Sequence, residues 1–174
     1  MEDRTVLRRA AQPIQGTLTV LAQSDSPAIR TEAVHFSTTD SMEFWDLTDI
    51  VRDVVVRSRV RHGQVTVGTP HTTTSIVINE SETGFHNDFR QLSDVLIPVD
   101  VYYEHDDLAI RTENVQEDEY VNGHAHCRQL LIGQSSVTLP VVEGEVLLGQ
   151  WQKVMFVELD QARDRRAFVH AQGI

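Results

Sequence analysis

The sequence lacks several features that mark specialised classes of protein. Its single cysteine, Cys127, cannot close a disulfide within the chain, which fits a reducing compartment. There is no run of Lys or Arg, and the formal net charge of −11 would repel a phosphodiester backbone. No segment approaches the roughly 20 apolar residues of a membrane span, and the polar start lacks the apolar stretch of a signal peptide. We therefore expect a cytoplasmic protein that binds neither nucleic acid nor membrane.

Familiar catalytic and metal-binding motifs are missing as well. The sequence has no Gly-rich phosphate loop, no G-x-S-x-G elbow and no HExxH motif. A single cysteine excludes a zinc site built from several thiolates. For Cys127 itself, a small buried residue in a helix is a better interpretation than a nucleophile. An active site would have to be built from other side chains.

What the sequence does contain is the composition of an ordinary folded domain. Apolar residues make up 40% and charged residues 24% of the 174 positions, which is close to average globular usage. A chain of this length buries roughly 70% of its accessible surface on folding. Neither a repeat nor a linker interrupts the sequence, so we predict a single domain over residues 1–174.

Hydrophobic patterning predicts strands near both ends and helices between them. Alternation predicts an opening hairpin of residues 17–21 and 33–37, and further strands at 64–68, 71–80, 137–141, 146–160 and 165–171. Helical spacing predicts helices at 48–60, capped by Thr48 and ended by Gly63, at 85–96, and at 125–132, closed by Gly133. The second helix should bury Phe89, Leu92, Val95 and Leu96. We expect an α+β fold, with an antiparallel sheet or sandwich and helices packed at one side.

The strand predicted at 71–80 has an unusual polar face. Alternate side chains of a strand share a face, so one face would carry His71, Thr73, Ser75, Val77 and Asn79. Imidazole, hydroxyl and amide groups are suited to holding a ligand, whereas a solvated face more often carries Lys and Glu. The alternative is a polar face at a subunit contact.

Two further segments place histidines beside polar partners. In VYYEHDD, a predicted strand, Asp106 and Asp107 could orient the imidazole of His105 or hold a cation, although a solvated loop histidine is the simpler alternative. In NGHAHCRQLLIG, Asn122 and His126 lie where a helix begins. The helix dipole lowers the pKa of an imidazole there and keeps it neutral at pH 7. We choose His126 over His124 as the functional residue, with Arg128 as a phosphate partner.

The last strands contribute one amide and a charged run. Gln152 shares a strand face with Glu158, and its amide would need a partner if it were buried. Trp151 is more often a core residue than a platform for substrate. The run from 160 to 166 is most simply a solvated turn with local ion pairs. His71, His105 and His126 could form an open three-ligand metal site, but they are too far apart in sequence to match a local spacing rule.

These segments together resemble the YjbQ-like family, also called the secondary thiamine-phosphate synthase family. The resemblance rests on HTTTSIVINE, YYEH, NGHAHCRQLLIG, SSVTLPVVEGEVLLGQWQ and ELDQARDRR, in that order. It implies a compact homotrimer with a polar pocket that the motif histidines line around a divalent metal ion, zinc or magnesium. The positions that match family motifs are His71, Asn79, Glu80, His105, Asn122, His126 and Gln152. Departures at Gln161, Ala162 and Leu130 leave the geometry around Arg163 open.

The activity attributed to that family is a weak condensation of a pyrimidine diphosphate with a thiazole phosphate. Cations are sparse near the motifs here, so phosphate-ester or small-metabolite chemistry is favoured over efficient thiamine phosphate synthesis. In an enzyme, His71, His105 and His126 would be metal ligands or acid–base groups. Substrate would contact Thr73, Asn79, Glu80, Asn122, Arg128 and Gln152. The alternatives are a trimeric protein that binds a metabolite or metal without turnover, and a purely structural role for these residues.

Overall fold

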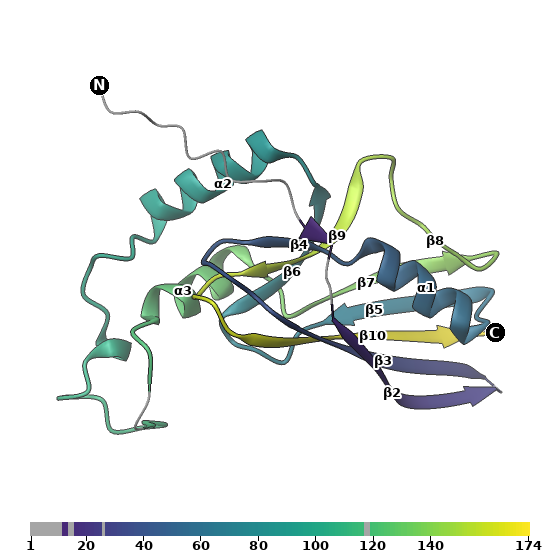
Figure 1. Ribbon diagram of the computed structural model, residues 1–174, viewed down its shortest axis with the longest axis horizontal. Coiled ribbons are helices and arrows are strands. Elements are labelled where there is room, and N and C mark those ends of the chain that lie inside the picture. The colour runs from purple at the N-terminus through teal and green to yellow at the C-terminus, as the bar shows by residue number, and fades with distance from the viewer. Residues whose placement is uncertain (1–11, 14–15, 26, 117–118) are drawn as a thin grey trace.

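A computed structural model describes residues 12–13, 16–25, 27–116 and 119–174 of the chain (Figure 1). The larger of its two sheets has six strands, and every neighbouring pair is antiparallel. In spatial order the strands are β2 (Thr17–Asp25), β3 (Ala28–Ser37), β10 (Asp164–Gly173), β5 (His62–Gly68), β7 (Ser136–Val142) and β8 (Glu145–Val146). The predicted opening hairpin is therefore confirmed, with longer strands than expected.

The smaller sheet has four strands and shares the main hydrophobic core with the larger one. Its spatial order is β1 (Gln12–Pro13), β4 (Phe44–Asp46), β9 (Gln152–Glu158) and β6 (Thr74–Glu80). The β1–β4 pair is parallel and the other two pairs are antiparallel. Ile76 and Phe156 from this sheet pack in the same cluster as Val65 and Val169 from the larger sheet.

Helix α1 (Thr48–Ser58) covers part of this core because its apolar residues recur on one face. Val51, Val54 and Val55 are all buried there. Thr48 does not cap the helix as predicted, because its hydroxyl accepts a hydrogen bond from the Val154 amide at 3.0 Å. The helix also ends earlier than expected, at Ser58, since Arg59 adopts a left-handed conformation with φ 62°.

The remaining helices lie together at the other end of the molecule (Figure 1). They are α2 (Thr83–Leu96), the short 3-10 helix η1 (Glu104–Asp106) and α3 (Gly123–Ile132). Of the four residues on the apolar face predicted for the second helix, only Phe89 packs against the core, while Leu92, Val95 and Leu96 are 55%, 76% and 54% exposed. The residues that α2 buries are His86 and Ser93.

The α+β class with antiparallel sheets is confirmed, while several local predictions are wrong. Residues 71–73 form a turn before β6, so His71 and Thr73 do not share a strand face with Asn79. VYYEHDD is not a strand, because it leads into η1. Residues 146–160 are divided between β8 and β9. Gly133 closes α3 as predicted, in an extended conformation with φ −116°, but the helix begins at Gly123 rather than at Ala125. None of the helices in the described ranges is long and apolar enough to cross a membrane.

Candidate functional site

A cavity of about 1070 Å³ lies where the β5–β6 connection, η1, the start of α3 and the start of β10 meet. Ligand sites for small molecules are commonly about 300–1,000 Å³, so this cavity could hold a substantial metabolite. Five of the predicted site residues line it, and they come from three separate sequence motifs: His71, Thr73, His105, Asn122 and His126.

Two of the histidines lie against each other at this cavity. The ring centroids of His105 and His126 are 4.4 Å apart, with 39° between the ring planes. Burial, and next to it the neighbouring His105, lowers the pKa of His126. The predicted direction of that shift is confirmed, although burial rather than the helix start is its leading cause. A pair of close imidazoles with a neutral His126 can exchange protons with a ligand.

Asp106 fixes one of these rings and also occupies the start of α3. Its Oδ1 lies 3.1 Å from Nδ1 of His105 and accepts hydrogen bonds from the backbone amides of Asn122, at 3.0 Å, and Gly123, at 2.9 Å. Burial would raise the pKa of Asp106, but the hydrogen bonds from His105 and the amides lower it overall. The helix N-terminus thus already holds a carboxylate, and Nε2 of His105 is left for other contacts.

Gly123 is required by this close packing. A Cβ atom at this position would lie 2.7 Å from Cβ of Tyr103 and 3.0 Å from Oδ2 of Asp106. Both distances are shorter than ordinary van der Waals contact, so a side chain here would displace the carboxylate that orients His105. Position 123 in the segment NGHAH must therefore be glycine for Asp106 to keep its contact with His105.

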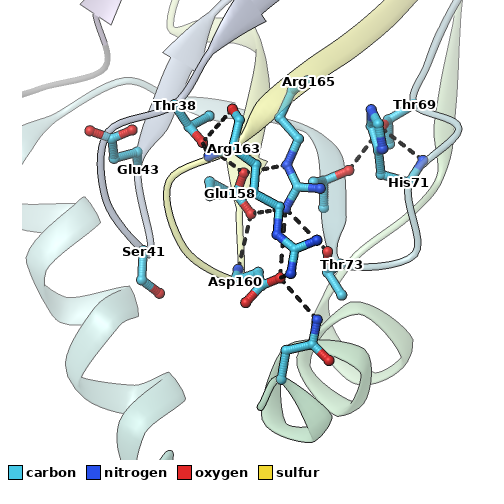
Figure 2. A network of polar contacts seen from close by, with 12 residues as sticks. Thr38, Ser41, Glu43, Thr69, His71, Thr73, Glu158, Asp160, Arg163 and Arg165 are labelled. Carbon is cyan, nitrogen blue, oxygen red and sulfur yellow. Dashed lines mark hydrogen bonds and ion pairs between the residues drawn. The ribbon is translucent and has the colours of Figure 1, made fainter. Parts of the chain in front are cut away.

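Behind the cavity lies a buried ion pair that the sequence did not reveal (Figure 2). Arg165 donates to the two carboxylate oxygens of Glu158 at 2.5 and 2.6 Å, and to the Thr73 hydroxyl at 3.2 Å. The two charged side chains are 4% and 0% exposed. Thr38 donates to the same carboxylate at 3.0 Å. Burial raises the pKa of Glu158, while the Arg165 guanidinium opposes this.

A second ion pair connects this network to α3. Asp160 accepts a hydrogen bond from the Asn122 side chain at 3.0 Å and pairs with Arg163 at 2.9 Å. The Arg163 guanidinium also lies over the ring of Tyr120, 4.2 Å from its centroid. The prediction of a solvated turn at 160–166 is thus wrong in part, because Asp160 and Arg165 are buried. The local pairing of Asp160 with Arg163 and the exposure of Ala162, Asp164 and Arg166 agree with it.

His71 enters the cavity from the turn between β5 and β6. Its Nε2 accepts a hydrogen bond from the backbone amide of Arg166 at 3.0 Å. Burial lowers the pKa of His71, and the guanidinium groups of Arg165, Arg166 and Arg163 lower it further. The ring is therefore neutral at pH 7, and its side of the cavity is the side rich in cations.

Arg111 forms part of the cavity wall, and nothing in the sequence pattern pointed to it. Its guanidinium donates to the carbonyl oxygens of His105, Glu113 and Asn114 at 2.8, 3.1 and 3.0 Å. It also pairs with Glu119 at 2.7 Å. One side chain thus holds together the segment that follows η1.

Three predicted substrate contacts do not reach this cavity. Asn79 and Glu80 are exposed at the far end of β6, and Glu80 pairs in register with Gln152, which is also exposed. At about 3.3 Å per residue, Glu80 lies roughly 20 Å along β6 from the His71 end. The amide of Gln152 serves a local turn, where its Oε1 accepts from the Gly149 amide at 2.7 Å.

Arg128 is also not among the residues that line the cavity. Its side chain is 1% exposed and pairs with Asp94 at 2.7 Å. It donates to the Ile97 carbonyl at 2.9 Å, so it joins the end of α2 to α3. The expected burial of Cys127 is wrong, because this thiol is exposed on α3. Trp151, expected in the core, is 66% exposed.

The described residues around the cavity do not provide a complete set of protein ligands for a resident metal ion. In the described part of the chain, no three His, Cys, Asp or Glu side chains converge closely enough to hold one. Zinc sites in proteins use at least three protein ligands. His105 and His126 could supply two, and His71 already uses Nε2 for a backbone amide. The described residues of the chain therefore do not by themselves complete a resident zinc site.

Comparisons with known proteins agree with this fold and these segments. A family model described as "UPF0047 protein YjbQ-like" matches residues 32–174. A UPF0047 protein of Archaeoglobus fulgidus is 39% identical over 77% of this chain and 94% of its own length. One from Methanothermobacter thermautotrophicus is 33% identical over 83% and 93%. Among solved structures, a YbjQ-like protein of unknown function from Sulfolobus solfataricus has a TM-score of 0.73 and 28% identity, covering 84% of this chain and 98% of that one.

Proposed function

Because this chain belongs to the YjbQ-like UPF0047 family, whose relatives named above carry no stated activity, we propose that it is an enzyme acting on a small phosphate-bearing metabolite. His105 and His126 are its acid–base pair, and Asp106 orients His105. The observation that carries the proposal is the contact of these two rings, 4.4 Å apart, at a cavity of about 1070 Å³. More narrowly, we propose that the reaction is a transfer like that of a thiamine-phosphate synthase.

The distribution of charge supports an anionic group on the substrate. Arg163 and Arg165 line the cavity on the β10 side, each paired with a carboxylate, and Arg166 adds a further positive charge near His71 on the same side. The α3 N-terminus, by contrast, already holds the Asp106 carboxylate. A phosphate group therefore binds toward β10, which directs the remainder of the molecule to the imidazole pair.

A divalent ion, zinc or magnesium, is a separate part of the proposal. Such an ion would supply charge neutralisation for a leaving phosphate. His105 and His126 would be its protein ligands, and with the ion bound they would hold it instead of transferring protons. The described residues of the chain do not offer a third protein ligand for it.

Replacing His126 with alanine should reduce turnover at least about 100-fold, because proton transfer would lose one of its two imidazoles. The measurement is release of phosphate or pyrophosphate from a panel of phosphate esters and diphosphates. Cys127→Ser is the matched control, since Cys127 is the exposed neighbour on α3 and should leave turnover unchanged. Equal rates for His126→Ala and the wild type would contradict the assignment. Ligand binding without product from the wild type would instead indicate a metabolite-binding protein.

We further propose that the chain assembles as a homotrimer. The support is the uncovered apolar surface at the α2–α3 end, where Val95 and Leu130 are 76% and 84% exposed. Exposed apolar patches of this kind commonly mark subunit contacts. In such an assembly, Asn79, Glu80 and Gln152, which do not reach the cavity of their own chain, could contact the cavity of a neighbouring copy.

Light scattering should give three times the chain mass of 19.7 kDa. Val95→Asp should shift this mass toward that of the single chain, because a charge cannot be buried in an apolar contact without a partner. Val56→Asp is the control, since Val56 is similarly exposed, at 70%, but lies on α1. A mass of one chain for the wild type would rule out the trimer.

A further inference from the structure

His71 holds its ring in a way that determines which nitrogen faces the ligand. The β5–β10 ladder ends at the pair Gly68 and Phe168. Beyond this pair, the next β10 amide that points toward β5 is that of Arg166. No β5 residue lies opposite it, because the chain after Gly68 turns away through Pro70 to His71. The Nε2 atom of His71 accepts the hydrogen bond of the Arg166 amide at 3.0 Å, as a carbonyl oxygen of a neighbouring strand would.

This hydrogen bond assigns the proton of the imidazole. A backbone N–H can only donate, so the ring atom that faces it must be an unprotonated nitrogen. A neutral imidazole then carries its proton on Nδ1. Burial and the guanidinium groups of Arg165, Arg166 and Arg163 lower the pKa of His71, which keeps the ring neutral. In the described part of the chain, Nδ1 has no hydrogen-bond partner, and the residue lines the cavity.

We propose that His71 is a hydrogen-bond donor to the ligand through Nδ1–H and is not a metal ligand. Its acceptor is an oxygen of the phosphate group that the proposed function directs to the β10 side, so the inference rests on that function for the identity of the ligand. The Thr73 hydroxyl, which accepts from Arg165 at 3.2 Å, still has its own hydrogen to donate beside it. Together these groups form a donor-only subsite that selects an oxyanion.

The first test is the tautomer of His71 in the full-length protein. Two-bond ¹⁵N–¹H correlation spectra at pH 7 distinguish the Nδ1–H form, the Nε2–H form and the charged ring, and loss of one spin system in His71→Gln assigns the signals. We expect the Nδ1–H form. The Nε2–H form or a charged ring would overturn the proposal. Addition of zinc should leave both His71 nitrogens unchanged, and a shift that they share with His105 and His126 would also overturn it.

The second test separates the two nitrogens with side chains that replace one each. The Gln side chain can place its carbonyl where Nε2 lies and keep the Arg166 amide bonded, while it removes the donor that faces the cavity. Asn places an amide near the position of Nδ1 and leaves the Arg166 amide without its acceptor. With inorganic phosphate as the probe, His71→Gln should keep the melting temperature and weaken binding about tenfold, the value of one good hydrogen bond. His71→Asn should lower the melting temperature and retain more of the binding.

Wild-type phosphate affinity in His71→Gln would overturn the donor role, and so would equal losses of affinity in the two variants. These measurements do not require turnover. If no substrate is converted but the tautomer and phosphate results hold, the proposed enzyme fails and the donor subsite stands. If turnover is found but His71 carries its proton on Nε2, the enzyme stands and this inference fails.

Discussion

Arg165→Met should lower the free energy of unfolding by about 3–5 kcal/mol, the typical cost of leaving one partner of a buried ion pair alone. The Glu158 carboxylate is 0% exposed and would lose both of its guanidinium contacts, at 2.5 and 2.6 Å. Methionine keeps the unbranched stem of arginine but not its guanidinium group, so the single variant combines the unpaired charge with some lost packing. Denaturant unfolding would measure the loss of stability as a lower midpoint with an unchanged slope.

The double variant Arg165→Met with Glu158→Gln provides the control, because it removes both charges and should recover most of the lost stability. The deficit of the single variant should also depend on pH. With its guanidinium removed, the buried Glu158 would have a pKa raised further above that of the unfolded chain, so the folded state would bind the proton more tightly. The deficit should therefore shrink as the pH falls. A single variant within about 1 kcal/mol of the wild type would show that the pair is not important for stability.

Acid should destabilise the protein through His86. This side chain is 0% exposed, it stacks on Phe44 with ring centroids 4.0 Å apart, and among the described residues neither ring nitrogen has a hydrogen-bond partner of good geometry. Burial, with a further contribution from the Arg90 guanidinium, lowers the pKa of His86 from 6.5 to about 4, while Glu82 opposes the shift. An imidazole without a partner in an aromatic cluster is held neutral because a buried charge is costly.

The sign of the pH dependence follows from the proton counts. Between pH 6.5 and about 4 the unfolded chain protonates His86 while the folded chain does not, so stability is complete above this window and is lost as the pH falls through it. From pH 7 to pH 4 the loss from this residue should be about 3 kcal/mol. His86→Phe should abolish that part of the loss, whereas His35→Gln, at an exposed histidine, should leave it in place. The same pH dependence in His86→Phe as in the wild type would contradict this assignment.

The sequence predicted most of the strands because each shows its pattern locally. Alternation identifies β3, β5, β7 and β10, whose faces are partly buried. It failed at residues 71–73, where Pro70 precedes a turn and the polar alternation continues by chance into β6. It also failed at VYYEHDD, where aromatic residues imitate a strand although Asp106 is needed to accept the amides at the start of α3.

For the site, sequence reasoning found the histidines and missed the residues that position them. His105, Asn122 and His126 stood out because such polar residues are unusual next to strand and helix patterns. Arg165 and Asp160 looked like an ordinary charged turn, since burial of a charge depends on partners distant along the chain. The predicted face of α2 shows the reverse error, because helical spacing indicates an apolar face but not whether the rest of the fold covers it.

Arg111 has a consequence for the thermodynamics of ligand binding. Its bonds to the carbonyl oxygens of His105, Glu113 and Asn114 exist before any ligand arrives. When a cavity wall becomes ordered only on binding, the lost conformational entropy weakens the binding free energy, typically by about 0.5–1.5 kcal/mol for each immobilised side chain. Much of that cost is already met here by folding, so a small molecule with few contacts can still be retained.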